Sequence, residues 1–171
     1  NVVPEELEFT VENTPTKMPV GQIVVNKSIK ESDIHWAHGN PTFRFTVSGT
    51  DTNGVKHTYQ DFVEFRPGNY TKDGNGNAIL SVTFNGVPTG TYEIIEAKTI
   101  RYSFGSCARV TSNVTEKGTY LQAVLSYNKS SGTVPKAEGT FYNNHTQYDQ
   151  YSHTDVSENI ANFVVPQLNP R

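Results

Sequence analysis

A lysine near the start of the chain lies within an alternating apolar segment, VVNKSIK (residues 24–30). Successive side chains of a β-strand point to opposite faces. Counting by twos from Ile23 therefore places Lys27 on the apolar face of a strand and Lys30 on the polar face. The pattern predicts a lysine that points into the core of the protein.

The same count places two more polar side chains on apolar faces. In GTYEIIE (90–96), Glu96 shares a face with Tyr92, and Glu93 points outward. In GTFYNN (139–144), Asn143 shares a face with Phe141. A buried charge without a partner is costly, so a lysine and a glutamate in one core are expected to be adjacent or neutralised.

These three residue types together can perform a specific reaction. Burial lowers the pKa of a lysine, which yields a nucleophilic neutral amine, and raises the pKa of a glutamate, which then stays protonated. Attack by Lys27 Nζ on Asn143 Cγ would expel ammonia and leave an amide cross-link, while Glu96 polarises the carbonyl and moves protons. Fixed proximity inside a core replaces the activation that this slow reaction lacks in water.

A conventional explanation exists for each residue. Lys27 would be an edge-strand lysine whose amine reaches solvent, Glu96 an exposed carboxylate at a strand end, and Asn143 a turn residue. The coincidence of all three on inward faces favours the cross-link.

The elements that must position these residues are short strands. Segments rich in Val, Ile, Thr, Tyr and Phe alternate in character at 42–47, 61–65, 78–84, 91–96, 108–115, 119–127 and 138–143. Between them lie pairs that favour tight hairpin turns: Asn53-Gly54, Asp73-Gly74, Asn75-Gly76 and Asn85-Gly86. Many short strands without a helical stripe predict an all-β fold, an antiparallel Greek-key β-sandwich with extended terminal segments.

The predicted sandwich occupies residues 22–144. Residues 1–21 contain one alternating segment and a proline-punctuated stretch, so we expect a linker or the end of an upstream repeat. Residues 145–171 are polar and rich in Tyr, Asn and His until ANFVVP, and are expected to form a C-terminal extension or connector.

Composition excludes several classes of function. The formal net charge is −3 and no run of Lys or Arg occurs, so neither nucleic acid nor a membrane is an expected partner. The single cysteine, Cys107, allows no intrachain disulfide. No nucleophile elbow, zinc-binding helix or phosphate-binding glycine loop is present, so the sequence predicts no cofactor, no metal and no enzyme beyond a single self-directed turnover.

Four segments carry a resemblance to a known family. IVVNKSI, TFRFTVSG, DGNGNAILSVTFNGVPTGTYEIIE and GTFYNN resemble successive strands of a Cna protein B-type (SpaA-like, prealbumin-like) domain of Gram-positive surface proteins and pilins. The resemblance covers about residues 22–144. It implies a β-sandwich whose first-strand lysine and last-strand asparagine form an isopeptide bond assisted by a glutamate, roles that fall on Lys27, Asn143 and Glu96.

The resemblance implies a structural stalk, adhesin or pilin module at the extracellular, cell-wall-associated surface. Its expected partners are neighbouring domains or subunits of the same surface protein or pilus. The alternative is a module that binds a host matrix protein or glycan through its loops, with DIHWAHGN (33–40) and HTQYDQYSHTD (145–155) as contact surfaces. The first of these segments contains two histidines and the only tryptophan, and is expected to be a surface loop.

Overall fold

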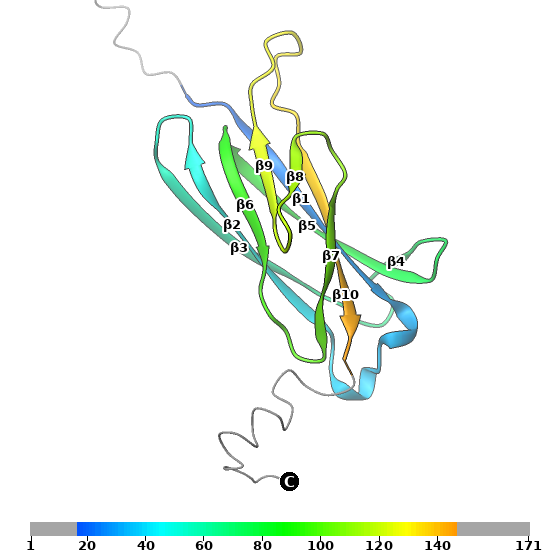
Figure 1. Cartoon of the computed structure of the whole chain (residues 1–171). Helices are drawn as coiled ribbons and strands as arrows, with labels where there is room; N and C mark the ends of the chain where they lie inside the picture. Colours follow the sequence, from blue (N-terminus) through cyan, green and yellow to red (C-terminus); the bar gives the residue numbers. More distant parts are fainter. Residues whose placement is uncertain (1–16, 147–171) are drawn as a thin grey trace, which may run out of the picture.

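Two five-stranded β-sheets pack face to face in the computed structural model, which describes residues 17–146 (Figure 1). The first sheet has the order β4-β5-β1-β10-β7 and the second β3-β2-β6-β9-β8. The strands are β1 Val20–Lys30, β2 Thr42–Asp51, β3 Lys56–Glu64, β4 Thr71–Lys72, β5 Asn77–Pro88, β6 Gly90–Glu96, β7 Tyr102–Arg109, β8 Val114–Glu116, β9 Leu121–Leu125 and β10 Ala137–His145. Two short 3-10 turns, η1 Glu31–Asp33 and η2 Trp36–His38, follow β1.

Alternating strands produce this architecture. In β6, Tyr92 and Ile94 are fully buried while Glu93 between them is exposed, as a strand with one solvated face requires. The inner faces of the sheets meet through aromatic side chains: the rings of Phe45 and Phe141 lie 5.3 Å apart and tilted. The predicted all-β sandwich is confirmed.

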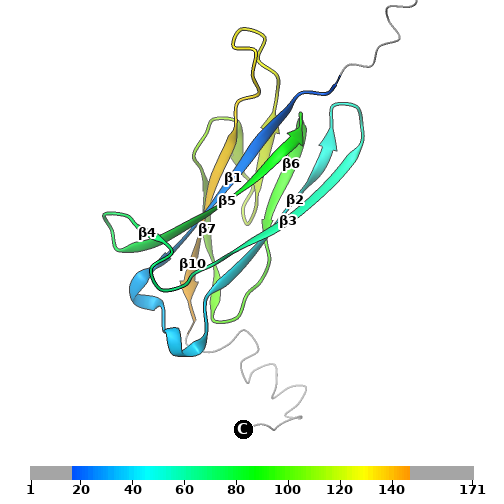
Figure 2. The same ribbon diagram turned by 180° about the vertical axis from the view of Figure 1, so that it is seen from behind.

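One strand pair departs from the antiparallel expectation. β1 and β10 lie side by side and run in the same direction, with Lys27 opposite Phe141. The two ends of the described chain consequently lie at opposite ends of the sandwich, which both views show (Figures 1 and 2). Alternation within a strand carries no information on the direction of its partner, so the sequence pattern did not reveal this pairing.

Three of the four predicted turn pairs lie in hairpin turns, and the fourth does not. Asn53-Gly54 connects β2 to β3, and the segment from Asp73 to Gly76 connects β4 to β5. Asn85-Gly86 lies inside β5, where β1 pairs Gly21 with Val87 but Ile23 with Phe84. Two residues of β5 therefore oppose one of β1, a β-bulge whose positive φ of 67° at Gly86 is the conformation that also suits hairpin turns.

The predicted strand at 108–115 is also wrong in part. β7 begins earlier, at Tyr102, and ends at Arg109; the chain then turns and enters the other sheet as β8 at Val114. The amide of Val114 donates to the carbonyl of Thr111, which closes the turn, and Val110 is exposed. Val110 is β-branched and therefore typical of strands, so its presence in this turn made the sequence pattern read as one continuous strand.

The strand bounds lie close to the predicted domain limits. β1 begins two residues before position 22, and β10 ends one residue after position 144. The strand-like segments predicted near residues 7–11 and 160–165, and most of the predicted extensions, lie outside the described residues. Within residues 17–146, no helix is both long and apolar enough to span a bilayer.

Candidate cross-linking site

Lys27 lies in the middle of β1, flanked by β5 and β10, and its side chain points between the two sheets. It is fully buried, with a relative exposure of 0%. Its Nζ lies 2.9 Å from Glu96 Oε2 and donates to the carbonyl oxygen of Phe141 at 3.3 Å. It also lies 4.5 Å from the centroid of the Phe43 ring, a cation–π arrangement.

Glu96 is the last residue of β6, in the opposite sheet, and its side chain is only 3% exposed. It reaches Lys27 across the core because β6 alternates from Tyr92, through Ile94, to this inward position. The outward neighbour Glu93 is exposed. The Lys27–Glu96 contact therefore bridges the two sheets.

Asn143 lies in β10, two residues after Phe141, the register partner of Lys27. Its side-chain amide donates a hydrogen bond to Glu96. Its Oδ1 is buried and makes no hydrogen bond within the described residues. Glu96 thus contacts both Lys27 and Asn143, and the three predicted site residues form one buried cluster.

Burial shifts the pKa of each ionisable group in the direction that favours its neutral form. Desolvation lowers the pKa of Lys27 from 10.5 to about 8, an effect that the nearby carboxylate of Glu96 opposes. Desolvation also raises the pKa of Glu96, against the opposing influence of Lys27 and of the Asn143 hydrogen bond. Burial therefore shifts both groups in the direction of the neutral amine and the protonated acid that the reaction needs.

The carbonyl oxygen of Asn143 is where this acid can act. An unpaired buried oxygen is costly, and a half-turn of the carboxamide exchanges its Oδ1 and Nδ2 positions. In that orientation a protonated Glu96 would donate a hydrogen bond to Oδ1 and polarise the carbonyl. The arrangement of donor, acceptor and amine suits nucleophilic attack on the amide carbon.

The outward residues beside the cluster complete the predicted register. Lys30 and Asn144 are both exposed, as the count by twos requires. The positions of Lys27, Glu96 and Asn143 agree with the sequence analysis, and the covalent bond between Lys27 and Asn143 remains a prediction.

The pKa of Lys27 gives a testable dependence of stability on pH in an unlinked protein. In an Asn143→Ala variant, the folded-state pKa of Lys27, about 8, lies below the ordinary value of 10.5. The unfolded chain then binds more protons between these two pH values, so stability should rise with pH across that window, by about 3 kcal/mol in total. Urea unfolding from pH 7.5 to 10.5 measures this rise.

The control for that experiment is the double variant Asn143→Ala with Lys27→Met. It retains the other titrating groups, so the difference between the two proteins reports the contribution of Lys27 together with its coupling to Glu96. Parallel curves for the two proteins would show that the Lys27 amine is not perturbed by burial.

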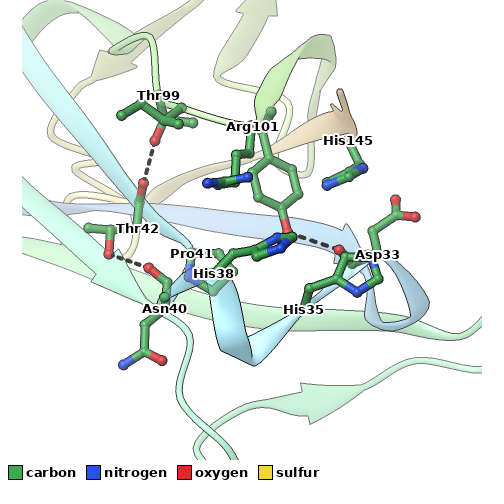
Figure 3. Close-up of a pocket in the computed structure, with 12 residues that line it drawn as sticks. Asp33, His35, His38, Asn40, Pro41, Thr42, Thr99, Arg101 and His145 are labelled. Carbon is green, nitrogen blue, oxygen red and sulfur yellow. Dashed lines mark hydrogen bonds between the residues drawn. The ribbon is translucent and has the colours of Figure 1, made fainter. Parts of the chain in front are cut away.

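The segment 33–40 forms the predicted surface loop, and it also lines a pocket that the sequence did not reveal. Figure 3 shows His35 and His38 from this segment together with Arg101 and with His145 at the end of β10. These residues are distant in sequence, so only the fold brings them together. Across residues 17–146, no group of three or more His, Cys, Asp or Glu is arranged to hold a metal ion.

No protein-family model matches this chain, and no curated protein matches it. Among solved structures, it is similar to a bacterial adhesin from Mobiluncus mulieris that contains intramolecular disulfide, isopeptide and ester bond cross-links. The two share 18% sequence identity with a TM-score of 0.37, and the similarity covers 74% of this chain and 41% of the adhesin chain. The chain thus spans less than half of that adhesin.

Proposed function

We propose that this chain is a structural module of a bacterial surface adhesin or pilus, held together by an amide bond between Lys27 Nζ and Asn143 Cγ. The observation that carries the proposal is the buried cluster, in which Glu96 contacts both a fully buried lysine and an asparagine. The resemblance of residues 22–144 to Cna protein B-type domains supports the same residues in the same roles. The proposed location is the extracellular, cell-wall-associated surface of a Gram-positive bacterium.

The reaction follows from the protonation states that burial favours. The neutral amine of Lys27 attacks Cγ of Asn143 while protonated Glu96 donates a hydrogen bond to the carbonyl oxygen. Glu96 then carries a proton from Nζ to the departing Nδ2. One C–N bond forms, one breaks, ammonia leaves, and Glu96 ends as it began. The reaction needs no cofactor and occurs once per chain, so the module is not an enzyme in the usual sense.

A simple buried ion pair explains the cluster less well. Removing two charges from water costs several kcal/mol per ion, and a well-packed apolar pair is often as stable or more stable. An ion pair also gives no role to the buried, unpaired Oδ1 of Asn143. Cross-linking converts the amine and the carboxamide into one neutral amide, which removes the charge of Lys27 from the core.

The position of the proposed bond suits a protein under tension. The chain enters the sandwich through β1 and leaves it through β10, at the opposite end (Figure 1). A bond between Lys27 and Asn143 would pass force directly from one of these strands to the other. The remaining strands would then carry little load, which is the property required of a stalk between neighbouring domains.

The assignment of residues can be tested by intact mass. The purified protein should be lighter than its sequence by one ammonia, and Lys27→Ala or Asn143→Ala should each have the full mass of its own sequence. The matched controls are the exposed neighbours: Lys30→Ala and Asn144→Ala should still lack one ammonia. Full mass in Lys30→Ala together with an unchanged deficit in Lys27→Ala would place the bond on Lys30 and refute the assignment.

A second function is favoured by a separate observation. The pocket lined by the 33–40 segment lies at one end of the sandwich, a typical place for ligand recognition by loops on a rigid scaffold. A stalk module that also binds a host glycan or matrix protein would use this end.

A further inference from the structure

A pocket of about 340 Å³ lies where β10 ends, between three segments of the chain. The connection from β1 to β2 contributes Asp33, His35 and His38; the loop between β6 and β7 contributes Arg101; and β10 contributes His145 (Figure 3). Its volume lies at the lower end of the range of small-molecule sites. The pocket therefore suits a ligand of about monosaccharide size.

Three histidines and an arginine are among the residues that line the pocket. The ring centroids of His35 and His38 lie 5.5 Å apart, and those of His35 and His145 lie 5.7 Å apart. The side chains of Arg101 and Asp33 line the same pocket. Three imidazoles in this arrangement would repel one another when protonated, and an anion between them would relieve that repulsion.

The walls of the pocket are fixed before any ligand binds. The ring of Tyr102 packs edge-on against Phe43 at 5.3 Å, and its hydroxyl donates to the carbonyl of Asp33. The hydroxyl of Thr99 donates to the carbonyl of Thr42 at 2.9 Å, which ties two of the three segments together. Such pre-organisation reduces the entropy lost on binding.

Arg101 adds backbone strain at the same place. Its φ of 72° makes it the one residue other than glycine with a positive φ in the part of the chain that the structure describes. This conformation costs about 1 kcal/mol or more and persists where surrounding contacts enforce it, often at ligand sites. Here the amide of Thr146 donates to the Arg101 carbonyl at 2.8 Å.

We propose that this pocket binds an acidic sugar, with the carboxylate of the sugar held by Arg101 and the histidines. Guanidinium and imidazolium groups form strong, charge-assisted hydrogen bonds to a carboxylate. The carboxylate of Asp33 can accept hydrogen bonds from sugar hydroxyls on the same small ligand. The carboxylate of Asp33 would repel a doubly charged phosphate, which favours a singly charged ligand bearing hydroxyls.

The test follows the histidine ring resonances of the full chain by NMR during titration with N-acetylneuraminic acid and with glucuronic acid. His57 is an internal reference, because it pairs with Asp51 at the β2–β3 hairpin, at the other end of the sandwich (Figure 1). Saturable shifts of His35, His38 and His145 with at least one acid sugar, without shifts of His57, are expected. The absence of saturable shifts at about pH 5.5 with both sugars would overturn the proposal.

Titrations with two further ligands separate the contribution of the sugar hydroxyls from that of the carboxylate. Glucose tests the hydroxyls alone and acetate the carboxylate alone; both should bind at least tenfold more weakly than the acid sugar. Equal binding of acetate would show an unspecific anion site, and equal binding of glucose would show that the cations play no part, so either result overturns the proposal. Because the pocket shares no residue with the Lys27–Asn143 cluster, either proposal can fail while the other holds.

A variant completes the design. Arg101→Asn removes the guanidinium and introduces a residue that tolerates positive φ, so the loop conformation is retained. Binding of the acid sugar should weaken about tenfold or more, with the His57 resonance unchanged. Unchanged affinity in a variant whose spectrum is otherwise native would contradict the role given to Arg101.

Discussion

A Glu96→Gln variant is expected to fold into the same sandwich with Lys27 and Asn143 unlinked. Glutamine matches glutamate in shape but cannot shuttle protons between Nζ and the leaving group. Proton transfer by a positioned acid or base contributes about 100-fold to 10,000-fold to a rate, so cross-linking should slow by a comparable factor. Intact mass followed over days after purification measures the remaining rate.

The matched control is Glu93→Gln, a substitution three residues earlier on the same strand. Glu93 is exposed on the outer face of β6, so this variant should cross-link like the unaltered protein. If Glu96→Gln cross-linked at the parent rate and Glu93→Gln cross-linked slowly, the assisting acid would be Glu93 on the outer face of β6. That result would refute the proposed site. A circular dichroism spectrum that matches the parent separates lost chemistry from lost folding.

The second large expected effect is on the length of chain that is released when the protein is pulled from its two ends. In the linked protein, residues 28–142 are enclosed by the bond, and force runs from β1 directly into β10. An Asn143→Ala variant lacks the bond and leaves Lys27 beside Glu96, so all ten strands can extend. At about 3.5 Å per residue, its unfolding should release roughly 40 nm of chain, whereas the linked protein should release almost none. Single-molecule force spectroscopy measures this length.

The same pair of proteins should differ in thermal stability. By analogy with a disulfide, closing a loop from residue 27 to residue 143 restricts the unfolded chain by about 4 to 5 kcal/mol. The unlinked variant should therefore melt on the order of 15 °C earlier and be cleaved faster by proteases. Asn144→Ala, which alters an exposed neighbour, should behave like the parent in both force and heat. If the parent protein released as much chain under force as the unlinked variant, the proposed mechanical role of the bond would be contradicted.

Strand alternation predicted that the three site residues point inward, because that direction depends only on the face of each strand. Whether Lys27, Glu96 and Asn143 point inward depends on parity within each strand, which the local sequence carries. That the three meet depends on pairing between distant strands. The parallel pairing of β1 with β10 brings Lys27 and Asn143 together, because it places Phe141 opposite Lys27 and Asn143 lies two residues further along β10.

The errors in the predicted fold arose where one local sequence pattern is compatible with two different structures. The Asn85-Gly86 pair permits a positive φ, which suits a hairpin turn and equally a bulge in a long strand. The alternation around Val110 continues through a turn that moves the chain from one sheet to the other. In both places long-range pairing decided the outcome.

The sequence analysis named the segments that contain the pocket histidines, 33–40 and 145–155, as contact surfaces, but it did not predict that they meet in one pocket. Its imidazoles come from residues 35, 38 and 145, and its arginine from the loop before β7. Surface histidines carry no periodic pattern of burial, so nothing in the separate segments indicates that they meet. The β10 strand brings His145 to the β1–β2 connection, and only the complete topology contains that information.

The measurement that tests the central claim most directly is tandem mass spectrometry of a protease digest of the unaltered protein. The account predicts a branched peptide in which the segments containing Lys27 and Asn143 are joined, with a mass one ammonia below the sum of the two linear peptides. Fragmentation should place the branch at the side chains of these two residues. Recovery of both segments as separate, unmodified linear peptides would contradict the account.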